Sequence, residues 1–278
     1  MTSIASALAE ARAMIPGNEA RLLLRHVLGC QAAYLEAHRE DELLAESAAR
    51  FADWVGRRAA GTPIAYLTGV REFFGREFDV TDAVLIPRPE TELLVELGIA
   101  KIRNVICAQS PRILDLGTGS GCVAVSLALE LPAARVTAAD ISAKALQMAQ
   151  HNAQRHQVRL CCIESDWFAG AGGQAYDLIV ANPPYISLGD PHLAEGDLRF
   201  EPVSALVSGA DGLAAIRQIV GAAPRHLAPG GWLLFEHGYD QADLAHELLS
   251  SAGFSHIEQH RDLAGIVRVS GGCAAMAT

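Results

Sequence analysis

From residue 111 onward, short apolar strands alternate with helices, and a glycine-rich turn separates the first strand from the first helix. We expect this strand at residues 112–116, the turn at Asp115-Leu116-Gly117-Thr118-Gly119-Ser120-Gly121 and the helix at residues 122–130. Such alternation is typical of a parallel sheet with helices on its faces. Ligands bind such sheets beyond the carboxyl ends of the strands, where glycines let the backbone approach a ligand closely.

The alternation continues almost to the end of the chain. Further strands are expected at residues 135–139, 158–163, 177–181, 232–236, 255–260 and 266–270, and helices at 142–154, 212–227 and 241–251. Together with the first strand, these predict an α/β fold with a seven-stranded, Rossmann-like sheet. The small residues of 271–278 predict a disordered tail.

The residues around the glycine turn indicate the class of cofactor. The dinucleotide fingerprint is G-x-G-x-x-G, whereas here the third glycine, Gly121, comes one residue earlier. Asp140 follows Gly121 by nineteen residues at the end of the next strand, where a carboxylate can accept both ribose hydroxyls. Trp167 follows a further strand and can flank an adenine, although a half-buried aromatic without a ligand is the plainer reading. The early third glycine, Asp115 before the turn and Asn182-Pro183-Pro184-Tyr185 three strands later together favour S-adenosylmethionine over a nicotinamide cofactor.

A second motif, Asn182-Pro183-Pro184-Tyr185, follows the apolar strand at 177–181. Its prolines end the strand and restrict the backbone. A planar amino group has two N–H donors, and the Asn182 side-chain oxygen and the Pro183 carbonyl are two fixed acceptors for them. The Tyr185 ring can pack on such a group. The alternative is a Pro-Pro turn that ends a strand without any function.

The part of the chain before the sheet is expected to hold helices up to about residue 60 and a hairpin at residues 70–80. Gly29 should end one helix, and Asp41 should cap another at residues 41–58. The hairpin turn is expected at Gly75-Arg76. The segment after it, residues 85–92, is either a linker that starts a helix or a cover over the cofactor pocket. The long loop at residues 186–211 should help to form the substrate groove.

Composition limits the class of partner and the compartment. The formal net charge is −10 and the isoelectric point is about 5.4, whereas a duplex DNA binder usually has a basic face. No metal site is expected, since no metal-binding spacing of histidine or cysteine occurs. Cys161 and Cys162 suggest reduced core thiols. The absence of a signal-peptide pattern and of a membrane-spanning apolar run predicts a cytoplasmic protein.

Six segments together carry a family resemblance. They are Leu85-Ile86-Pro87-Arg88-Pro89-Glu90-Thr91, the turn at 115–121, Ser165-Asp166-Trp167-Phe168, Asn182-Pro183-Pro184-Tyr185, Arg199-Phe200-Glu201-Pro202 and Glu236-His237-Gly238. With these, almost the whole chain resembles the protein-(glutamine-N5) methyltransferases that modify peptide chain release factors, the HemK/PrmC family. In the segment at 262–268, apolar Ile266 and Val267 replace residues that are often polar or proline in that family.

The resemblance implies a domain plan and a set of functional residues. It implies a helical release-factor-recognition domain at residues 1–68, a β-hairpin linker at 69–88 and a class I, S-adenosylmethionine-dependent methyltransferase domain at 89–278. The cofactor would be held by Gly117, Thr118, Gly119, Ser120, Gly121, Asp140, Trp167 and Asn182. The target glutamine of a release factor's Gly-Gly-Gln loop would be held by Asn182, Pro183, Pro184 and Tyr185. Of these, Asn182, Pro183 and Tyr185 would be catalytic. The protein would be a monomer without direct nucleic-acid or membrane contacts.

Two rival functions share parts of this pattern. A DNA amino-methyltransferase acting on a flipped base uses the same Asn-Pro-Pro-Tyr chemistry, but the net charge of −10 weighs against it. A non-catalytic module that binds a termination factor would keep the helical part. The intact glycine turn and Asn182 weigh against that function.

Overall fold

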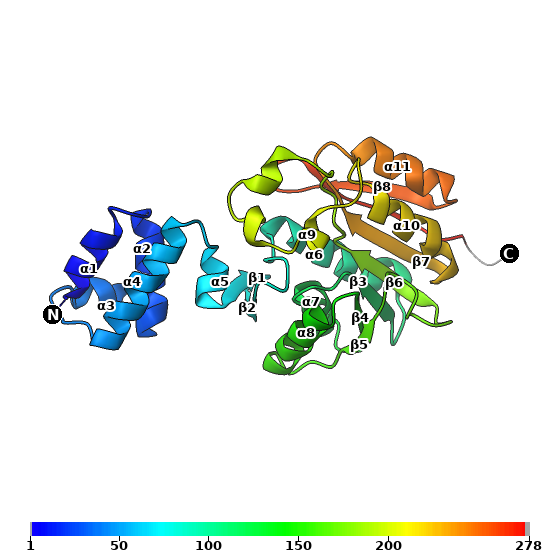
Figure 1. Cartoon of the computed structure of the whole chain (residues 1–278). Coiled ribbons are helices and arrows are strands. Elements are labelled where there is room, and N and C mark those ends of the chain that lie inside the picture. Colours follow the sequence, from blue (N-terminus) through cyan, green and yellow to red (C-terminus); the bar gives the residue numbers. More distant parts are fainter. Residues whose placement is uncertain (1, 276–278) are drawn as a thin grey trace. The chain divides into compact units, whose positions relative to one another are not determined.

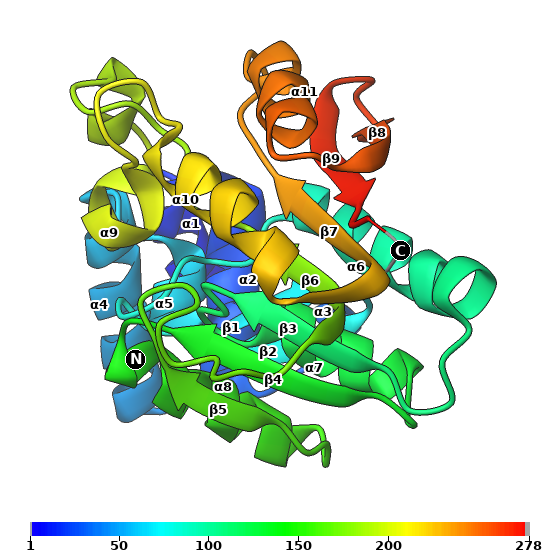
Figure 2. The same ribbon diagram turned by 90° about the vertical axis from the view of Figure 1, so that its right-hand side faces the viewer.

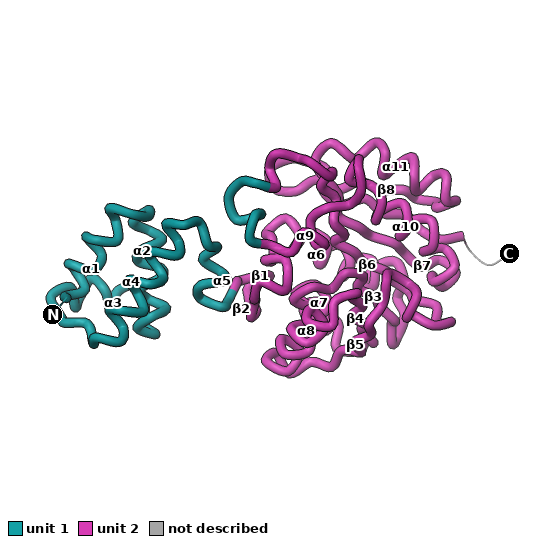
Figure 3. The backbone as a smooth tube through the Cα atoms, in the orientation of Figure 1, with its two compact units in different colours: residues 1–70, 194–200 teal, residues 71–193, 201–278 magenta. Residues whose placement is uncertain are grey.

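The computed structural model describes residues 2–275 and divides into two compact units (Figure 3). One unit comprises Met1–Val70 and Ala194–Phe200, and the other comprises Arg71–Leu193 and Glu201–Thr278. The chain therefore leaves the second unit for residues 194–200 and then returns to it. No helix in the described residues is long and apolar enough to span a membrane.

The first unit is helical and has a hydrophobic core of its own. Its helices are α1 (Ile4–Ala11), α2 (Gly17–Leu28), α3 (Ala32–Ala37), α4 (Ala45–Ala59) and α5 (Ile64–Thr68), with a short 3-10 helix at Leu198–Phe200. Leu23, Leu24, Phe51 and Trp54 are buried together in this core. The prediction for Gly29 is confirmed, since it takes a left-handed φ of 61° and ends α2.

The predicted cap at Asp41 is wrong. Helix α4 begins only at Ala45, after Leu44, and no side chain caps it. Asp41 instead uses its backbone, whose carbonyl accepts a hydrogen bond from the Ile4 N–H at 3.0 Å. A tertiary contact with the start of α1 has therefore displaced a local capping preference.

Residues 194–200 are joined to this helical unit by Arg58 of α4. The Arg58 guanidinium makes a bidentate pair with Glu19, at 2.7 and 2.9 Å, and reaches Asp197 at 3.2 Å. Gly61 is in close contact with Arg199, because a Cβ at Gly61 would lie 1.8 Å from the Arg199 Nη2. The segment thus packs against the helical unit at Gly61, whose φ of 100° favours glycine.

The second unit begins with a hairpin of β1 (Val70–Phe73) and β2 (Arg76–Asp79). Its turn is formed by Phe74 and Gly75, with φ of 51° and 70°, one residue earlier than predicted. Two successive left-handed residues match the twist of a tight hairpin. Phe73 and Phe78 are buried in the core of the second unit, so the hairpin belongs to that core.

The prediction of a seven-stranded sheet is confirmed (Figure 1). The strands are β3 (Arg112–Leu116), β4 (Arg135–Asp140), β5 (Cys161–Glu164), β6 (Tyr176–Ala181), β7 (Leu227–Glu236), β8 (Ser255–Arg261) and β9 (Val267–Cys273). Their order in the sheet is β5-β4-β3-β6-β7-β9-β8, parallel except at β9, which is antiparallel to both of its neighbours. The strand order reverses between β3 and β6, the position where such sheets bind ligands.

Helices cover both faces of this sheet (Figures 1 and 2). They are α6 (Glu92–Lys101), α7 (Cys122–Glu130), α8 (Ala143–Arg155), α10 (Ala214–Ala222) and α11 (Ala242–Ser251). The second unit also contains the short helix α9 (Val203–Leu206), 3-10 turns at Pro89–Thr91, Pro191–Ala194 and Ala223–Arg225 and a π turn at Ile102–Ile106. Alternate residues of each strand face opposite ways. Leu178 and Val180 of β6 pack with α6 and α7, whereas Ile179 packs with α10 and α11.

Several predicted helix and strand boundaries are wrong, at positions where tertiary contacts rather than the local sequence set the end of an element. The expected strand at 158–163 is limited to β5, the expected helix at 212–227 is shorter, and β7 already begins at Leu227. Of the expected disordered tail, Gly271 to Cys273 form the end of β9, and residues 276–278 lie outside the described part. Cys161 is exposed rather than in the core, because β5 lies at an edge of the sheet.

Candidate active site

A cavity of about 500 Å³ lies at the carboxyl ends of the parallel strands, within the second unit. It brings together Gly117 and Gly119 after β3, Asp140 at the end of β4, Trp167 after β5, and Asn182 and Pro184 after β6. Residues far apart in the sequence meet there because parallel strands end at one edge of the sheet. The other predicted site residues, Thr118, Ser120, Gly121, Pro183 and Tyr185, do not line this cavity.

The glycine turn offers an open stretch of backbone to the cavity. Gly117, Gly119 and Gly121 all have left-handed φ values, of 70°, 55° and 79°. A Cβ at Gly121 would lie 2.9 Å from the Ala149 backbone, so glycine is required for packing against α8. A Cβ at Gly119 would meet nothing within 4 Å. The turn therefore leaves room at Gly119 for a ligand to approach the main chain.

The side chains of the turn point into the protein and hold it in shape. Thr118 and Ser120 are buried. The Thr118 hydroxyl donates to Asp115 at 2.7 Å, and burial raises the pKa of Asp115 to about 7. These buried side chains therefore hold the turn in shape from its protein-facing side.

Asp140 is fixed at the rim of the cavity by two backbone donors. Its carboxylate accepts from the Gly119 N–H and from the Ser142 N–H, both at 2.9 Å. Burial raises the pKa of Asp140, and these N–H groups oppose the shift. A carboxylate held beside the glycine turn suits a pair of sugar hydroxyls.

Trp167 lies against the glycine turn in a strained backbone conformation. Its φ is 48°, a left-handed value that costs a bulky residue about 1–3 kcal/mol. The Ser165 hydroxyl stabilises this conformation, donating to the Trp167 carbonyl at 2.7 Å and accepting from the Gly170 N–H at 2.7 Å. The indole lies 3.7 Å from the position of a Cβ on Gly117. Strain of this kind is concentrated at ligand sites.

The Asn-Pro-Pro-Tyr turn is anchored by buried polar groups. The Asn182 Nδ2 donates to the Thr91 hydroxyl at 3.0 Å, and that hydroxyl donates to Glu236 Oε2 at 2.7 Å. The Tyr185 hydroxyl donates to the other Glu236 oxygen at 3.2 Å. Burial raises the pKa of Glu236 to about 7, against hydrogen bonds from Thr91 and Tyr185 that lower it. Burial, and then Glu236, also raise the pKa of Tyr185.

The segment after the hairpin forms one wall of the cavity, as one of the two readings of residues 85–92 proposed. Leu85 lines the cavity together with Pro202, Ser204, Ala205 and Val207, of which Ser204 and Ala205 belong to α9. Glu201 holds the two segments together, since its buried carboxylate accepts from Arg88 at 2.5 Å and from the Ile86 N–H at 3.3 Å. The loop at 186–211 thus contributes to the cavity through its later part, which also contains α9.

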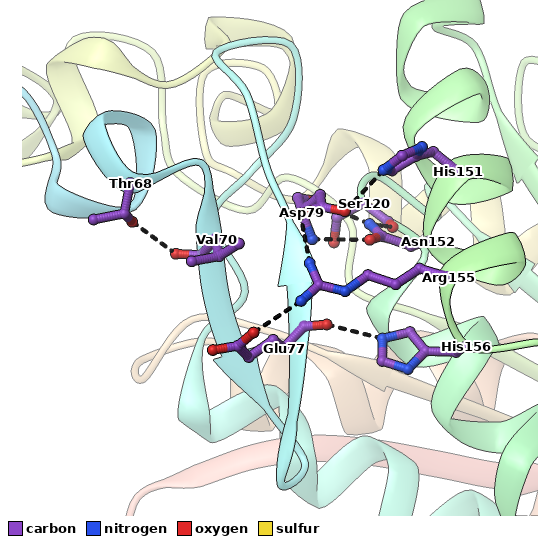
Figure 4. A network of polar contacts seen from close by, with 9 residues as sticks. All are labelled: Thr68, Val70, Glu77, Asp79, Ser120, His151, Asn152, Arg155 and His156. Carbon is purple, nitrogen blue, oxygen red and sulfur yellow. Dashed lines mark hydrogen bonds and ion pairs between the residues drawn. The ribbon is translucent and has the colours of Figure 1, made fainter. Parts of the chain in front are cut away.

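A single buried amide links the hairpin to the glycine turn (Figure 4). Asn152 of α8 is 0% exposed, and its Oδ1 accepts from the Asp79 N–H at 2.8 Å. Its Nδ2 donates to the carbonyls of Asp79, at 2.9 Å, and of Ser120, at 2.8 Å. Around it, Arg155 pairs with Glu77 and Asp79 at the protein surface.

Sequence reasoning assigned no role to Thr91, Glu201, Glu236 or Asn152. Thr91, Glu201 and Glu236 lie in segments on which the family resemblance rests. The sequence therefore marked these residues but did not indicate what they do. Asn152 gave no signal, because an asparagine on a helix is usually solvated. Its partners lie 32 and 73 residues away in the chain.

Comparison with known proteins identifies both parts of the chain. The PrmC N-terminal domain matches residues 1–69, and the methyltransferase small domain matches residues 91–194. The release factor glutamine methyltransferase of Bordetella pertussis is 51% identical, over 93% of this chain and 95% of its own length. That of Burkholderia pseudomallei is 52% identical, over 91% of this chain and 90% of its own length.

Solved structures support the fold independently of sequence. A methyltransferase from Pyrococcus furiosus has a TM-score of 0.54 at 17% identity, over 81% of this chain and all of its own. The hMettl16 catalytic domain has a TM-score of 0.55 at 14% identity, over 91% of this chain and 93% of its own. Identities this low show a shared fold alone, whereas the curated relatives match at high identity over nearly their whole length. The chain therefore belongs to the release factor glutamine methyltransferase family.

Proposed function

We propose that the chain transfers a methyl group from S-adenosyl-L-methionine to the side-chain amide nitrogen of the glutamine in the Gly-Gly-Gln motif of peptide chain release factors. The observation that carries this proposal is the shared cavity of Asn182, Gly119, Asp140 and Trp167. An acceptor for an amide and the expected contacts of a nucleoside cofactor face one space.

The residues present fit S-adenosylmethionine. The open backbone at Gly117 and Gly119 would hold its methionine part, Asp140 its ribose and Trp167 its adenine, while Thr118, Ser120 and Gly121 keep the turn in shape. When bound, the cofactor supplies an electrophilic methyl group on a sulfonium. The protein's own task is then mostly positioning, which can contribute several kcal/mol to lowering a barrier.

The Asn-Pro-Pro-Tyr turn supplies that positioning for the substrate. Asn182 Oδ1, in the cavity, accepts one N–H of the target amide, and the carbonyl of the adjacent Pro183, whose side chain lies outside the cavity lining, accepts the other. Both stabilise the positive charge that develops on the substrate nitrogen. Pro184 lines the cavity, and Tyr185 holds the turn from behind through Glu236. No strong base is required, because the methylated nitrogen is acidic enough to lose its proton to water.

The same proposal assigns roles to the parts of the chain. Residues 1–68 would recognise the release factor, residues 69–88 form a hairpin linker and residues 89–278 carry out the transfer. The match of residues 1–69 to the PrmC N-terminal domain supports this division. The protein would act as a cytoplasmic monomer.

The test is transfer of labelled methyl to a purified bacterial release factor and to a variant with the Gly-Gly-Gln glutamine changed. Label on the first alone is the expected result, with Asn182→Ala as the inactive control. Cofactor binding without label on either would overturn the substrate assignment. Label on DNA, with binding that falls steeply with salt, would favour a DNA amino-methyltransferase. Absence of cofactor binding would favour a non-catalytic module.

A further inference from the structure

We propose that Thr91 and Glu236 are positioning residues that fix which atom of the Asn182 amide faces the cavity. The inference rests on the proposed function, because the facing atom matters only if Asn182 accepts a hydrogen bond from the substrate. Neither Thr91 nor Glu236 lines the cavity, so both act through Asn182.

The need for such residues follows from the shape of an amide. The oxygen and the NH₂ group of asparagine are nearly the same size, so packing alone does not distinguish the two orientations. Only the oxygen can accept from a substrate NH₂ group. With the amide reversed, two donors would face each other, and the substrate nitrogen would lose a partner. The hydrogen bonds around Asn182 must therefore select one orientation.

Thr91 provides this selection because a hydroxyl has a single proton. The Thr91 proton is donated to Glu236 Oε2 at 2.7 Å, in a buried contact. The Thr91 oxygen then acts as the acceptor toward Asn182, 3.0 Å from its Nδ2. With Nδ2 held by Thr91, the Asn182 Oδ1 is left for the cavity. Among the described residues, none donates a hydrogen bond to that oxygen.

Glu236 sets the direction of the whole chain of bonds. An ionised carboxylate only accepts, and Tyr185 donates to its second oxygen at 3.2 Å. Burial raises the pKa of Glu236 to about 7, against the hydrogen bonds from Thr91 and Tyr185 and the charge of Arg268, so the ionised form prevails above that pH. Each oxygen of the Glu236 carboxylate thus accepts one hydrogen bond, from Tyr185 or from Thr91. The single proton of the Thr91 hydroxyl is therefore directed to Glu236 and not to Asn182.

Three separate elements meet in this network. Thr91 precedes α6, Asn182 follows β6 and Glu236 ends β7. The bonds span 91 and 145 residues of sequence, so the orientation of Asn182 is set by the tertiary fold. This gives the threonine of the Ile-Pro-Arg-Pro-Glu-Thr segment and the glutamate of the Glu-His-Gly segment one shared task.

Thr91→Val and Thr91→Ser form a matched pair for the test. Valine keeps the shape and removes the hydroxyl, whereas serine keeps the hydroxyl and removes a methyl group. We expect Thr91→Val to slow single-turnover methyl transfer to a release factor by about 10–100-fold, and Thr91→Ser to recover most of the rate. Cofactor affinity should stay within about threefold in both variants. Thr137→Val on β4, away from the cavity, controls for the substitution itself.

A second readout needs no substrate. In the ¹⁵N–¹H spectrum of the full chain, the Asn182 side-chain NH₂ signals should shift in Thr91→Val and keep their positions in Thr91→Ser. Equal rates for the valine and serine variants, with the wild type active, would overturn the inference. Unchanged Asn182 signals in Thr91→Val would overturn it as well. If the wild type does not transfer methyl but its Asn182 signals still depend on the Thr91 hydroxyl, the proposed function is refuted. The hydrogen-bond network through Thr91 is then still supported.

Discussion

At the scale of single residues, Asn182 is the group on which the proposed chemistry depends most. Its amide lines the cavity, and its nitrogen end is already bonded within the protein. An acceptor fixed before the substrate arrives loses little energy in reorganising during the reaction. The oxygen of this amide is thus the preorganised part of the site.

Asn182→Ala should therefore lower the rate of methyl transfer by about 10²–10³-fold. The loss reflects a missing acceptor where positive charge develops on the substrate nitrogen. The measurement is single-turnover transfer at saturating cofactor. Calorimetry provides the control, with cofactor affinity changed far less than the rate. A variant that transfers at the wild-type rate would remove Asn182 from the mechanism.

Glu236 should make stability depend on pH in a defined direction. Its folded pKa is about 7, against an ordinary value of 4.5. Below pH 4.5 the carboxyl is protonated in both states, and between these values only the unfolded chain ionises. Unfolding then releases a proton, so rising pH lowers the free energy of unfolding until about pH 7.

Glu236→Gln removes this effect. The difference in free energy of unfolding, Glu236→Gln minus wild type, should increase by up to about 3 kcal/mol from pH 5 to pH 8. Urea unfolding of both proteins at the two pH values is the measurement. Asp115, whose pKa is also raised to about 7, contributes equally to both proteins and cancels. A difference that does not change with pH would contradict the raised pKa of Glu236.

At the scale of elements, the hairpin, α8 and the glycine turn are joined by one buried side chain. Asn152 satisfies both backbone groups of Asp79 and the carbonyl of Ser120 (Figure 4). Since Ser120 belongs to the glycine turn, the support of the proposed cofactor site extends to the hairpin.

Asn152→Ala should cost about 2–4 kcal/mol, because it leaves buried backbone groups without partners. Arg155→Ala is the matched control on the same helix, where loss of partly exposed ion pairs should cost no more than about 1 kcal/mol. Chemical denaturation of the apo-protein measures both. Comparable losses for the two variants would mean that the surface pairs, not the buried amide, hold the hairpin.

The elements also show how far the sequence determines the fold. The bounds of β3 and α7 are as predicted, since a strong apolar pattern is bounded by glycines there. The end of β9 was missed because Gly271 gives no strand signal. A Cβ at that glycine would lie 2.5 Å from the Leu233 carbonyl, so close strand pairing explains it. That residues 85–92 cover the cavity was only one of two interpretations of the sequence. The Arg88–Glu201 pair that holds this segment in place joins residues 113 apart, which the local sequence does not indicate.

At the scale of the whole molecule, each unit has its own hydrophobic core. Trp54 is buried in the helical unit, whereas Trp167 and Trp232 belong to the second unit. All of the residues that line the cavity belong to the second unit. A ligand that binds there stabilises the unit that forms the site.

Denaturation should therefore proceed in two transitions, and S-adenosylmethionine should raise the midpoint of one of them only. Trp54→Phe should remove the fluorescence change of the unaffected transition, while circular dichroism still records it. Urea titration with and without the cofactor is the measurement. A single transition that shifts as a whole with the cofactor would show that the two cores unfold together.

The assignment of residues 194–200 to the helical unit also bears on how such a protein can be recombined. A chimera joined at residue 70 would carry a foreign set of helices but keep the native Asp197 and Arg199. Asp197 would then lose its ion pair with Arg58, and Arg199 would lose the close approach that Gly61 permits. The helical unit is therefore encoded by two separate segments of the sequence. Only an exchange that replaces both segments transfers the complete unit.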